Sequence, residues 1–357
     1  PPFSLEAGRM PVVLEATRKM RAAVGDELAL YGLVCGPFTL AMHLAGSELF
    51  LAMYDDLDAV ADLVMRCAEV SAVAAEAYVE AGADVVAIVD PMVSQIGADH
   101  FAQLVTPAVN AVADRVHAKQ ALASLFVCGD ATRNLEAMAQ TTCDNISIDE
   151  NIDLAKLAAI GQQYDVSIGG NLMLTVALLL GSQDDVTRDV LRAYEQGGET
   201  GFILAPGCDL PYAVPPENLE RVAELAHDSY QRGVAAATLP DPEAADQFDD
   251  VQLPSYANEA PVIVDCITLD SLTCPPCRYM VDVAQRAAAK LGGERVVVRE
   301  HKVTGRDGLG YMTKLGVSNI PTLCVDGAVR HVSLIPSVDA LASELEEALA
   351  CKPSAAN

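Results

Sequence analysis

Short runs of β-branched and other apolar residues alternate with long amphipathic segments through most of this 357-residue chain. A continuous apolar run is typical of a strand buried on both faces, and a long 3.6-residue repeat is typical of a helix that covers such strands. Their alternation predicts a parallel sheet covered by helices. The predicted strands are Leu28–Val34, Ala83–Val89, Leu122–Val127, Asn145–Ile148, Val166–Gly169 and Phe202–Ala205. The clearest predicted helices are Leu57–Glu80, Phe101–His117, Asp184–Gln196 and Pro216–Tyr230.

The number of these units limits the architecture. Six strands precede residue 233, whereas a closed (β/α)8 barrel needs eight. The pattern alone is consistent with an open sheet or with an incomplete barrel. In either arrangement, functional groups are expected where the strands end at their carboxyl side.

Several candidate functional residues follow these strands, namely Asp90, Cys128, Asp149, Asn171 and Cys208. Aspartate at such a point can bind a ligand, but it can equally cap the next helix. The two cysteines can be functional thiols or small core residues. Because the carboxyl ends of parallel strands share one edge of the sheet, we favour functional roles for Cys128 and Cys208 at that edge.

Charge divides the chain into two parts. Residues 259–357 carry 10 basic and 12 acidic side chains, while the preceding residues carry 13 and 38. Between the two parts, residues 233–258 contain five acidic side chains, three prolines and no basic side chain, which is typical of a solvated linker and predicts a domain boundary. The formal net charge of -27 argues against nucleic acid or an anionic membrane surface as the main partner.

The sequence gives no indication of a membrane or secretory location. The longest apolar run, Leu172–Gly181, is too short to span a bilayer, and no basic segment followed by an apolar one opens the chain. Ten cysteines in a chain of this length do not form the dense framework of a small secreted domain. We therefore expect a cytoplasmic protein.

After the predicted linker the pattern changes to a smaller α/β unit. Its predicted strands are Pro261–Thr268, Arg295–Glu300, Leu323–Asp326 and Val332–Leu334. Its predicted helices begin at the Cys274 motif and continue through Leu291, then cover Gly308–Leu315 and Val338–Leu349. The Asp326-Gly327 pair predicts a hairpin turn between the last two strands.

The motif Cys274-Pro275-Pro276-Cys277 predicts thiol–disulfide exchange. At a helix N-terminus Cys274 would be the more exposed sulfur, and free backbone N–H groups would favour its thiolate. Cys277, one turn later, could resolve a mixed disulfide. The alternative is half of a zinc site, but no second cysteine pair follows at zinc-finger spacing.

A set of short motifs in the first part carries a family resemblance. The motifs are Gly36-Pro37-Phe38-Thr39, Asp90-Pro91, Phe126-Val127-Cys128-Gly129, Ser147-Ile148-Asp149, Gly170-Asn171, Pro206-Gly207-Cys208-Asp209 and Pro215-Pro216-Glu217-Asn218. Over residues 7–232 the chain resembles the uroporphyrinogen decarboxylase superfamily, which includes decarboxylases and zinc-dependent, corrinoid-linked methyltransferases. The resemblance implies a TIM barrel over residues 1–232 that lacks its N-terminal strands.

Within that superfamily the details favour the methyltransferases. Decarboxylases are expected to show a Gly-His-Gly turn where this chain has Gly207-Cys208-Asp209. A first part of net charge -25 is also poorly suited to a tetrapyrrole that carries many carboxylates. The resemblance therefore implies methyl transfer to a small thiol, with a corrinoid-carrying partner protein. Tetrapyrrole decarboxylation and a non-catalytic barrel that acts as a scaffold remain as alternatives.

The methyltransferases resembled here bind zinc through a His-x-Cys pair and a further Cys, which implies Cys128 and Cys208 as metal ligands. The expected His position is Phe126, which cannot bind a metal. A third ligand would have to come from elsewhere, with His43, Asp90 and Asp130 as candidates, or the zinc site is lost. The same barrel edge implies substrate-binding roles for Asp90, Asp149 and Asn171, and for His43, which follows the Gly36-Pro37-Phe38-Thr39 motif.

Residues 259–357 resemble thioredoxin and glutaredoxin-like domains in the order of their elements. The supporting motif is Gly316-Val317-Ser318-Asn319-Ile320-Pro321-Thr322, in which the resemblance implies a cis Pro321 close to the cysteine pair. We therefore expect a redox domain with Cys274, Cys277 and Pro321 as its catalytic residues, acting on Cys128 and Cys208 or on a disulfide-containing partner protein. A homo-oligomer is left open.

Overall fold

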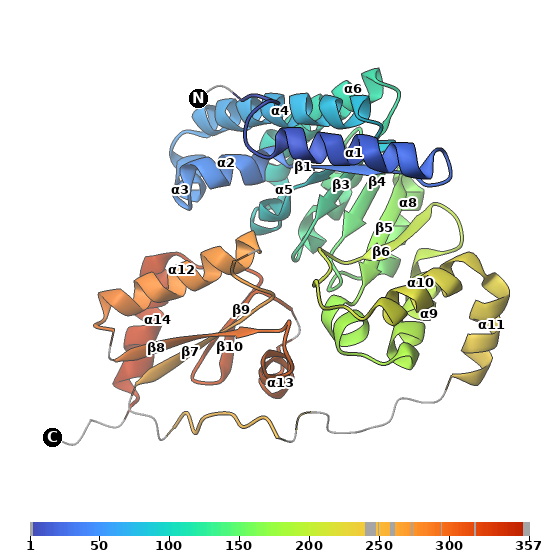
Figure 1. Cartoon of the computed structure of the whole chain (residues 1–357). Coiled ribbons are helices and arrows are strands. Elements are labelled where there is room, and N and C mark those ends of the chain that lie inside the picture. Colours follow the sequence, from blue (N-terminus) through green and yellow to red (C-terminus); the bar gives the residue numbers. More distant parts are fainter. Residues whose placement is uncertain are drawn as a thin grey trace. The chain divides into compact units, whose positions relative to one another are not determined.

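The computed structural model describes residues 3–239, 248, 250–257, 261–272, 274–293, 295–317 and 319–352 (Figure 1). By their contacts the residues form two compact units, Pro1–Asn171 with Ala193–Cys208, and Leu172–Arg192 with Asp209–Asn357. The predicted boundaries at residues 232 and 259 stay a prediction. Among the described residues, no helix is both long and apolar enough to cross a bilayer.

Six strands in sequential order form the first sheet, and β3 to β6 lie side by side in Figure 1. The strands are β1 (Tyr31–Cys35), β2 (Val85–Val89), β3 (Leu122–Val127), β4 (Asn145–Ile148), β5 (Ser167–Leu172) and β6 (Phe202–Pro206). The pairs from β1 to β5 are all parallel. The prediction of a parallel α/β sheet with six strands before residue 233 is confirmed, and β3 and β4 have the predicted bounds. Closure into an eight-stranded barrel stays a prediction.

Helices precede, connect and follow the strands of this sheet. They are α1 (Met10–Val24), α2 (Pro37–Ala45), α3 (Glu48–Asp55), α4 (Leu57–Glu80), η1 (Pro91–Gln95), α5 (Ala98–His100), η2 (Phe101–Val105), α6 (Thr106–Ala118), η3 (Thr132–Asn134), α7 (Leu135–Ala139), α8 (Leu154–Tyr164), η4 (Leu174–Leu179), α9 (Gln183–Gly197), α10 (Pro216–His227) and α11 (Ser229–Thr238). The bounds of α4 were predicted correctly, whereas α1 was not predicted.

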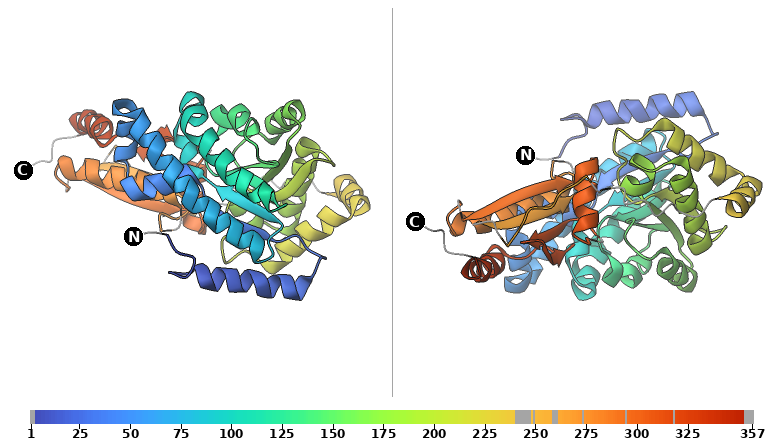
Figure 2. Two further views of the ribbon diagram at one scale, coloured as in Figure 1. Left: turned by 90° about the horizontal axis from the view of Figure 1, so that it is seen from above. Right: turned by 90° about the horizontal axis from the view of Figure 1, so that it is seen from below.

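The core of the first sheet is rich in small apolar side chains. Helices α4 and α6 pack against each other and lie together over the sheet in the view from above (Figure 2). The buried face of α4 is largely alanine and valine, among them Val64, Ala68 and Ala75. Such small side chains let two long helices approach closely, which burial of apolar surface then stabilises.

The second sheet has four strands in the order β10-β9-β7-β8. Its strands are β7 (Val262–Thr268), β8 (Val296–Lys302), β9 (Thr322–Val325) and β10 (Ala328–Val332). The central strand β7 is parallel to β8 and antiparallel to β9, which is antiparallel to β10. Helices α12 (Pro275–Lys290) and α14 (Val338–Ala350) pack on one face of this sheet, and α13 (Arg306–Lys314) packs on the other. The predicted turn at Asp326-Gly327 is present, but β10 begins at Ala328, four residues earlier than predicted.

The segment 233–258, which is predicted to be a solvated linker, is ordered or packed at both of its ends. At its start, α11 continues to Thr238, because the Asp228 side chain accepts hydrogen bonds from Tyr230 N and Gln231 N and starts a new helix after α10. At its end, Phe248 and Val251 pack with Leu309 of α13. Residues 240–247, 249 and 258 lie outside the described residues.

Residues 250–257 are tied to the second sheet by polar contacts as well. Lys314 Nζ donates to Val251 O at 2.6 Å, and Tyr256 Oη donates to Asp265 Oδ2 at 2.8 Å. Arg306 pairs with Asp250 at 2.6 Å. Proline and acidic residues therefore did not prevent this segment from packing, because Val251 is buried beside α13 and the half-buried Tyr256 bonds to Asp265 of β7.

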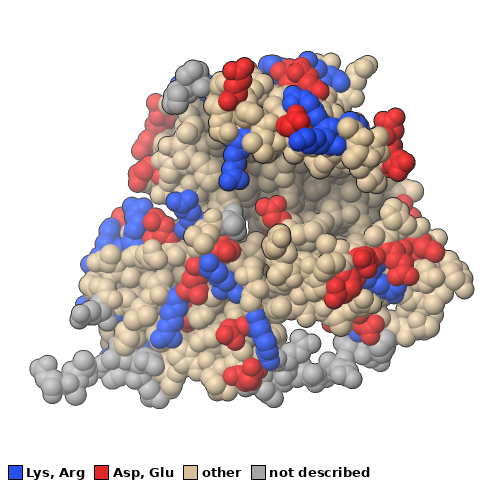
Figure 3. All heavy atoms as spheres, viewed as in Figure 1, with Lys and Arg blue, Asp and Glu red and all other residues tan. Residues whose placement is uncertain are grey.

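Basic side chains of the described residues are mostly close to acidic ones. Arg21 pairs with Asp84, Lys119 with Glu80 at 2.7 Å, and Lys302 with Asp270 at 2.7 Å, to name three examples. On the face drawn in Figure 3, Lys and Arg lie beside Asp and Glu, with no continuous basic patch among the side chains coloured there.

Candidate functional site

Cys128 and Cys208 meet at the carboxyl edge of the first sheet, with their sulfur atoms 2.8 Å apart. Cys128 follows β3 and Cys208 follows β6, three strands further along the sheet order. In a flat sheet those strand ends would be roughly 14 Å apart, since neighbouring strands are about 4.8 Å apart. Contact between the sulfurs therefore requires a curved sheet and inward-turning loops. Both side chains are half-buried, and neither is in a disulfide.

Asp149, which follows β4, fixes the backbone next to Cys128. Its carboxylate accepts a hydrogen bond from Gly129 N at 2.8 Å, and it also accepts from Asn151 N and Asn151 Nδ2. Asp149 is buried, and burial raises the pKa of its carboxyl group although these hydrogen bonds lower it. The structure thus places Asp149 behind the cysteine pair, where it positions the Cys128 turn.

Asn171 holds the same loop from the next strand. Its side-chain Nδ2 donates to Asp149 O at 3.0 Å and to Ile152 O at 2.8 Å, and the side chain is fully buried. Hydrogen bonds to two carbonyl groups of one loop restrain its backbone. Asn171 therefore supports Asp149 and, through it, the turn that carries Cys128.

Gly207 brings Cys208 against this loop. A Cβ atom at Gly207 would lie 2.3 Å from Glu150 N, which is far inside van der Waals contact. A glycine is therefore required for the β6 end to approach the Asp149-Glu150 backbone so closely. The loop after β4 is the common support of both cysteines, and neither the loop nor this contact was predicted from the sequence.

Asp90, at the end of β2, is committed to a helix start. Its carboxylate accepts hydrogen bonds from Phe38 N at 3.1 Å, Thr39 N at 2.7 Å and Thr39 Oγ1 at 2.6 Å. Those N–H groups belong to the first turn of α2, which precedes Asp90 in the chain, whereas the expected alternative was a cap on the next helix. Asp90 is fully buried, which raises its pKa to about 6 against the opposing effect of these hydrogen bonds.

Two further residues were considered for this edge, His43 and Phe126. His43 is exposed on α2, near the C-terminal end of that helix. Phe126 is half-buried in β3, two residues before Cys128 and therefore on the same side of the strand. The substrate-binding roles of His43, Asp90, Asp149 and Asn171 stay predictions.

The cysteine pair does not fit a catalytic zinc ion. Such a site needs three protein ligands, and within the described ranges no three His, Cys, Asp or Glu side chains are grouped as a metal would require. His43, Asp90 and Asp130, the predicted sources of a third ligand, therefore do not complete it. Two thiolates on one tetrahedral zinc ion would also lie about 3.8 Å apart, so the sulfurs, at 2.8 Å, would have to separate.

A second cysteine pair lies at the start of α12. Cys274 and Cys277 form a disulfide, with their Cα atoms 5.3 Å apart. Cys274 is the N-cap of the helix and half-buried, whereas Cys277 is fully buried. The peptide between Ile320 and Pro321 is cis, as expected from the sequence. The predicted catalytic roles of these residues stay predictions.

The loop before Cys274 is held by two side chains of β8. Glu300 accepts hydrogen bonds from Thr268 Oγ1, Ser271 N and Ser271 Oγ at 2.7, 3.0 and 2.9 Å. Lys302 pairs with Asp270 at 2.7 Å, which lowers the pKa of that carboxyl group. These contacts place the segment that leads into the disulfide. Neither contact was predicted from the sequence, and Lys302 lies beyond the expected end of β8 at Glu300.

A buried carboxylate lies in the middle of β7. Asp265 is fully buried and accepts from Tyr256 Oη, and its other oxygen is 2.7 Å from His301 Nε2. The His301 ring stacks on Tyr311, with ring centroids 3.8 Å apart. The sequence signal for this buried carboxylate is an acidic residue inside an otherwise apolar predicted strand.

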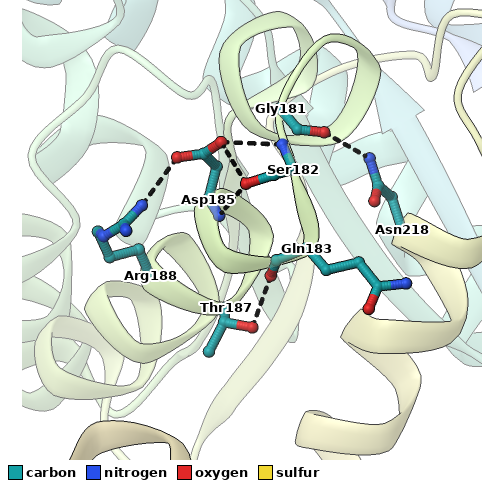
Figure 4. Close-up of polar contacts among 7 residues, drawn as sticks. All are labelled: Gly181, Ser182, Gln183, Asp185, Thr187, Arg188 and Asn218. Carbon is teal, nitrogen blue, oxygen red and sulfur yellow. Dashed lines mark hydrogen bonds and ion pairs between the residues drawn. The ribbon is translucent and has the colours of Figure 1, made fainter. Parts of the chain in front are cut away.

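Asn218, the last residue of a family motif, has a structural role. Its Nδ2 donates to Leu178 O at 2.9 Å and to Gly181 O at 3.1 Å, and so binds α10 to the end of η4 (Figure 4). Beside it, Ser182 Oγ accepts from Asp185 N, and Asp185 Oδ2 accepts from Ser182 N, which is a capping box at the start of α9. Burial raises the pKa of Asp185, but hydrogen bonds from Ser182 and the Arg188 ion pair outweigh it and lower the pKa.

The parallel sheet with thiols and buried carboxylates at its carboxyl edge defines an α/β protein whose candidate site lies at the strand ends. Residues 1–229 match the family model described as uroporphyrinogen decarboxylase (URO-D). The chain therefore belongs to the uroporphyrinogen decarboxylase family.

Relatives with known activities fall into two groups. The methylcobamide:CoM methyltransferase MtbA of Methanosarcina mazei is 31% identical over 226 residues, and the alignment covers 63% of this chain and 65% of that protein. MtaA of Methanosarcina barkeri is 32% identical over 234 residues, with 63% and 66% covered. A uroporphyrinogen decarboxylase of Anaeromyxobacter dehalogenans is 27% identical over 225 residues, with 61% and 64% covered. The chain thus spans slightly less than two thirds of the length of these relatives.

A solved structure agrees with the sequence relatives. A methyltransferase from Methanosarcina mazei superposes with a TM-score of 0.59 at 29% sequence identity, covering 63% of this chain and 66% of the other. The mixed α/β fold with its six-stranded parallel sheet is therefore similar to that of a methyltransferase.

Proposed function

We propose that this chain transfers a methyl group from a corrinoid to a small thiol, with the first sheet as the catalytic part. The observation that carries the proposal is the meeting of Cys128 and Cys208 at the carboxyl edge of that sheet. Its support from relatives is that MtbA and MtaA are named methylcobamide:CoM methyltransferases. The corrinoid would be presented by a partner protein.

The chemistry requires an acceptor sulfur in its thiolate form. The sulfur attacks the methyl group, the bond between carbon and cobalt breaks with its electron pair left on the corrinoid, and the thiol proton goes to solvent. The half-buried sulfurs of Cys128 and Cys208 would lie beside the acceptor and orient it, while Asp149, Asn171 and Gly207 hold them in place. Because the described side chains supply two zinc ligands rather than three, no step through zinc is proposed.

An anaerobic assay with methylcobalamin and coenzyme M tests the proposal. The full chain should consume methylcobalamin faster than the same mixture without protein, and Cys128→Ser and Cys208→Ser should each abolish most of that rate. Cys351→Ser is the matched control, because Cys351 is a free, exposed cysteine at the end of α14. A wild-type rate equal to the protein-free background would contradict the proposal.

Decarboxylation of uroporphyrinogen is the second candidate, favoured by the family model and by the Anaeromyxobacter relative. It predicts loss of carboxylate groups from uroporphyrinogen under the same anaerobic conditions. Product analysis by mass spectrometry distinguishes the two activities in one preparation, since only decarboxylation lowers the mass of uroporphyrinogen.

A non-catalytic first part is the third possibility, and Phe126 is the observation that favours it. Phe126→His would add an imidazole two residues before Cys128 on the same side of β3. If the site otherwise resembles that of the methyltransferases, the variant should bind zinc tightly after anaerobic purification, whereas wild type should not. A variant that still binds no metal and has no activity would favour a scaffold.

We further propose that the second sheet is a thioredoxin-like domain that exchanges disulfides. The strand order β10-β9-β7-β8, the disulfide at the start of α12 and the cis Pro321 support this proposal. The domain would include residues 250–257, which pack against α13 and β7. Reduction of insulin by the full chain, lost in Cys274→Ser and retained in Cys351→Ser, tests it.

A further inference from the structure

We infer that Cys128 and Cys208 are a second dithiol–disulfide couple, which exchanges electrons with the Cys274–Cys277 disulfide and so switches the first sheet's site between a reduced and an oxidised form. The exchange rests on the redox role proposed for Cys274 and Cys277. The formation of a disulfide between Cys128 and Cys208 rests on their geometry alone.

Geometry favours a bond between the two sulfurs. They are 2.8 Å apart, and a disulfide bond is about 2.05 Å long, so closure requires a movement of less than about 1 Å. The loop after β4 already holds the backbone beside both residues through Gly129 and Gly207. Separation of the sulfurs for a tetrahedral metal would be a movement of similar size in the opposite direction.

Accessibility distinguishes this pair from the buried cysteines of the described residues. Cys143, Cys266 and Cys324 are buried, and burial raises the pKa of each thiol to about 12. Cys35 is exposed, but desolvation of its thiol and the charge of Asp90 raise the pKa of that thiol to about 12 as well. Such thiols are almost entirely protonated at neutral pH and react slowly with disulfides. Cys128 and Cys208 are half-buried neighbours, so a disulfide reagent can reach one and the other can resolve the product.

The exchange balances without any further reagent. A thiolate of the Cys128–Cys208 pair attacks Cys274, the bond between Cys274 and Cys277 breaks, and Cys277 leaves as a thiolate that takes a proton. The second thiolate of the pair then attacks the mixed disulfide, which forms the Cys128–Cys208 bond and releases Cys274. Two electrons and two protons have moved from one pair to the other, and the reverse sequence restores the reduced site.

The oxidised form would be inactive in methyl transfer. Both sulfurs would then be in a bond, and neither could orient an acceptor thiol as proposed above. The redox state of the Cys274–Cys277 couple would therefore set the fraction of active sites.

Thiol trapping of the full chain tests both parts. The fully reduced protein is equilibrated anaerobically with glutathione and glutathione disulfide at a series of ratios, quenched in acid, alkylated with N-ethylmaleimide and digested. A cross-linked peptide pair that contains Cys128 and Cys208 is expected as the ratio becomes oxidising. Cys351→Ser should give the same pair, and Cys128→Ser should lose it while Cys274 and Cys277 still oxidise.

The rate of cross-linking tests the exchange. In the double variant Cys274→Ser with Cys277→Ser, the pair should form about tenfold more slowly from glutathione disulfide, because the faster route through Cys274 is removed. Absence of the cross-link at every ratio, in protein that folds as judged by circular dichroism, would overturn the couple. An unchanged rate in the double variant would overturn the exchange, and insulin reduction by wild type shows separately whether Cys274 and Cys277 are redox-active at all.

Discussion

The two cysteine pairs of this chain are built in opposite ways. Cys274 and Cys277 are three residues apart, and one helical turn brings them together. Cys128 and Cys208 are 80 residues apart and meet only because the ends of β3 and β6 converge. The first pair depends on local geometry, and the second depends on the curvature of a whole sheet.

The contacts that hold the two pairs in place also differ in being local for one pair and long-range for the other. Cys274 is the N-cap of α12, followed by two prolines, and Glu300 and Lys302 of the neighbouring strand hold the preceding loop. The distant pair depends on buried polar groups from β4 and β5 and on a glycine with no room for a side chain. A site that depends on long-range contacts should be more sensitive to substitutions in its support than a local one.

The largest effect is expected at Gly207. Gly207→Ala would place a Cβ atom 2.3 Å from Glu150 N, against backbone that cannot easily move, and should lower the free energy of unfolding by about 3 kcal/mol. Urea unfolding followed by circular dichroism measures it. Gly97→Ala, with nothing within 4 Å of the new Cβ, is the control and should change little. Equal effects of the two substitutions would contradict a close approach at Gly207.

Asp90 should make the stability of the first sheet depend on pH. Its pKa is raised from 3.8 to about 6 in the folded state, so the folded chain binds the proton more tightly than the unfolded chain. The stability of wild type relative to Asp90→Asn should therefore be greatest below about pH 4 and fall by up to about 3 kcal/mol as the pH rises to 6. Above that pH the difference should be constant.

Urea unfolding of both proteins between pH 4 and pH 8 measures this difference. Subtracting the free energy of unfolding of the variant from that of wild type at each pH removes the contribution of the other carboxylates. The disulfide exchange rate of Cys274 should not differ between them. If the difference in free energy of unfolding does not change with pH, the pKa of Asp90 is not raised by folding and the prediction is wrong.

Asp149→Asn is expected to affect the distant pair selectively. The amide has one acceptor oxygen, so it cannot accept from Gly129 N and from both Asn151 donors as the carboxylate does. The free energy of unfolding should decrease by about 2 kcal/mol. Methyl transfer and Cys128–Cys208 cross-linking should both decrease, whereas insulin reduction should not. Asp153→Asn is the matched control, because Asp153 is an exposed N-cap of α8 and asparagine caps a helix equally well.

The smallest effect is expected at Glu300. Glu300→Gln replaces one acceptor of the loop before Cys274 by an amide donor, and should cost about 1 kcal/mol. The looser loop should make the disulfide easier to reduce with dithiothreitol and leave Cys128–Cys208 cross-linking unchanged. Glu346→Gln, on the exposed side of α14, serves as the control. If both variants are reduced faster than wild type, the effect comes from the loss of a negative charge and not from the hydrogen bonds of the loop.

Much of the fold was predictable because it follows from local patterns. The bounds of β3, β4 and α4 agree with the apolar runs, and the Asp326-Gly327 turn agrees with its residue types. Several features that were not predicted concern contacts with distant residues. Residues 250–257 have a linker-like composition, but Val251 and Tyr256 find partners on α13 and β7 that no local pattern reveals.

The candidate site shows the same division. The sequence indicated that Cys128, Asp149, Asn171 and Cys208 follow strands, since alternation of apolar and polar residues is a local property. It could not indicate that Asp90 binds the start of α2 or that Asp149 and Asn171 form one support. Those contacts join different strands, and their partners depend on how the sheet curves.

By itself the sequence determined the alternating strands and helices, the two cysteine motifs and the helix start that joins Cys274 to Cys277, because each depends on residues within a few positions of one another. Only the tertiary structure decided that Cys128 and Cys208 touch, that no third metal ligand joins them within the described residues, and that Gly207 leaves room for the loop between them. The physical reason is that sulfur contact across three strands depends on sheet curvature, which is set by the packing of the whole unit rather than by any single segment.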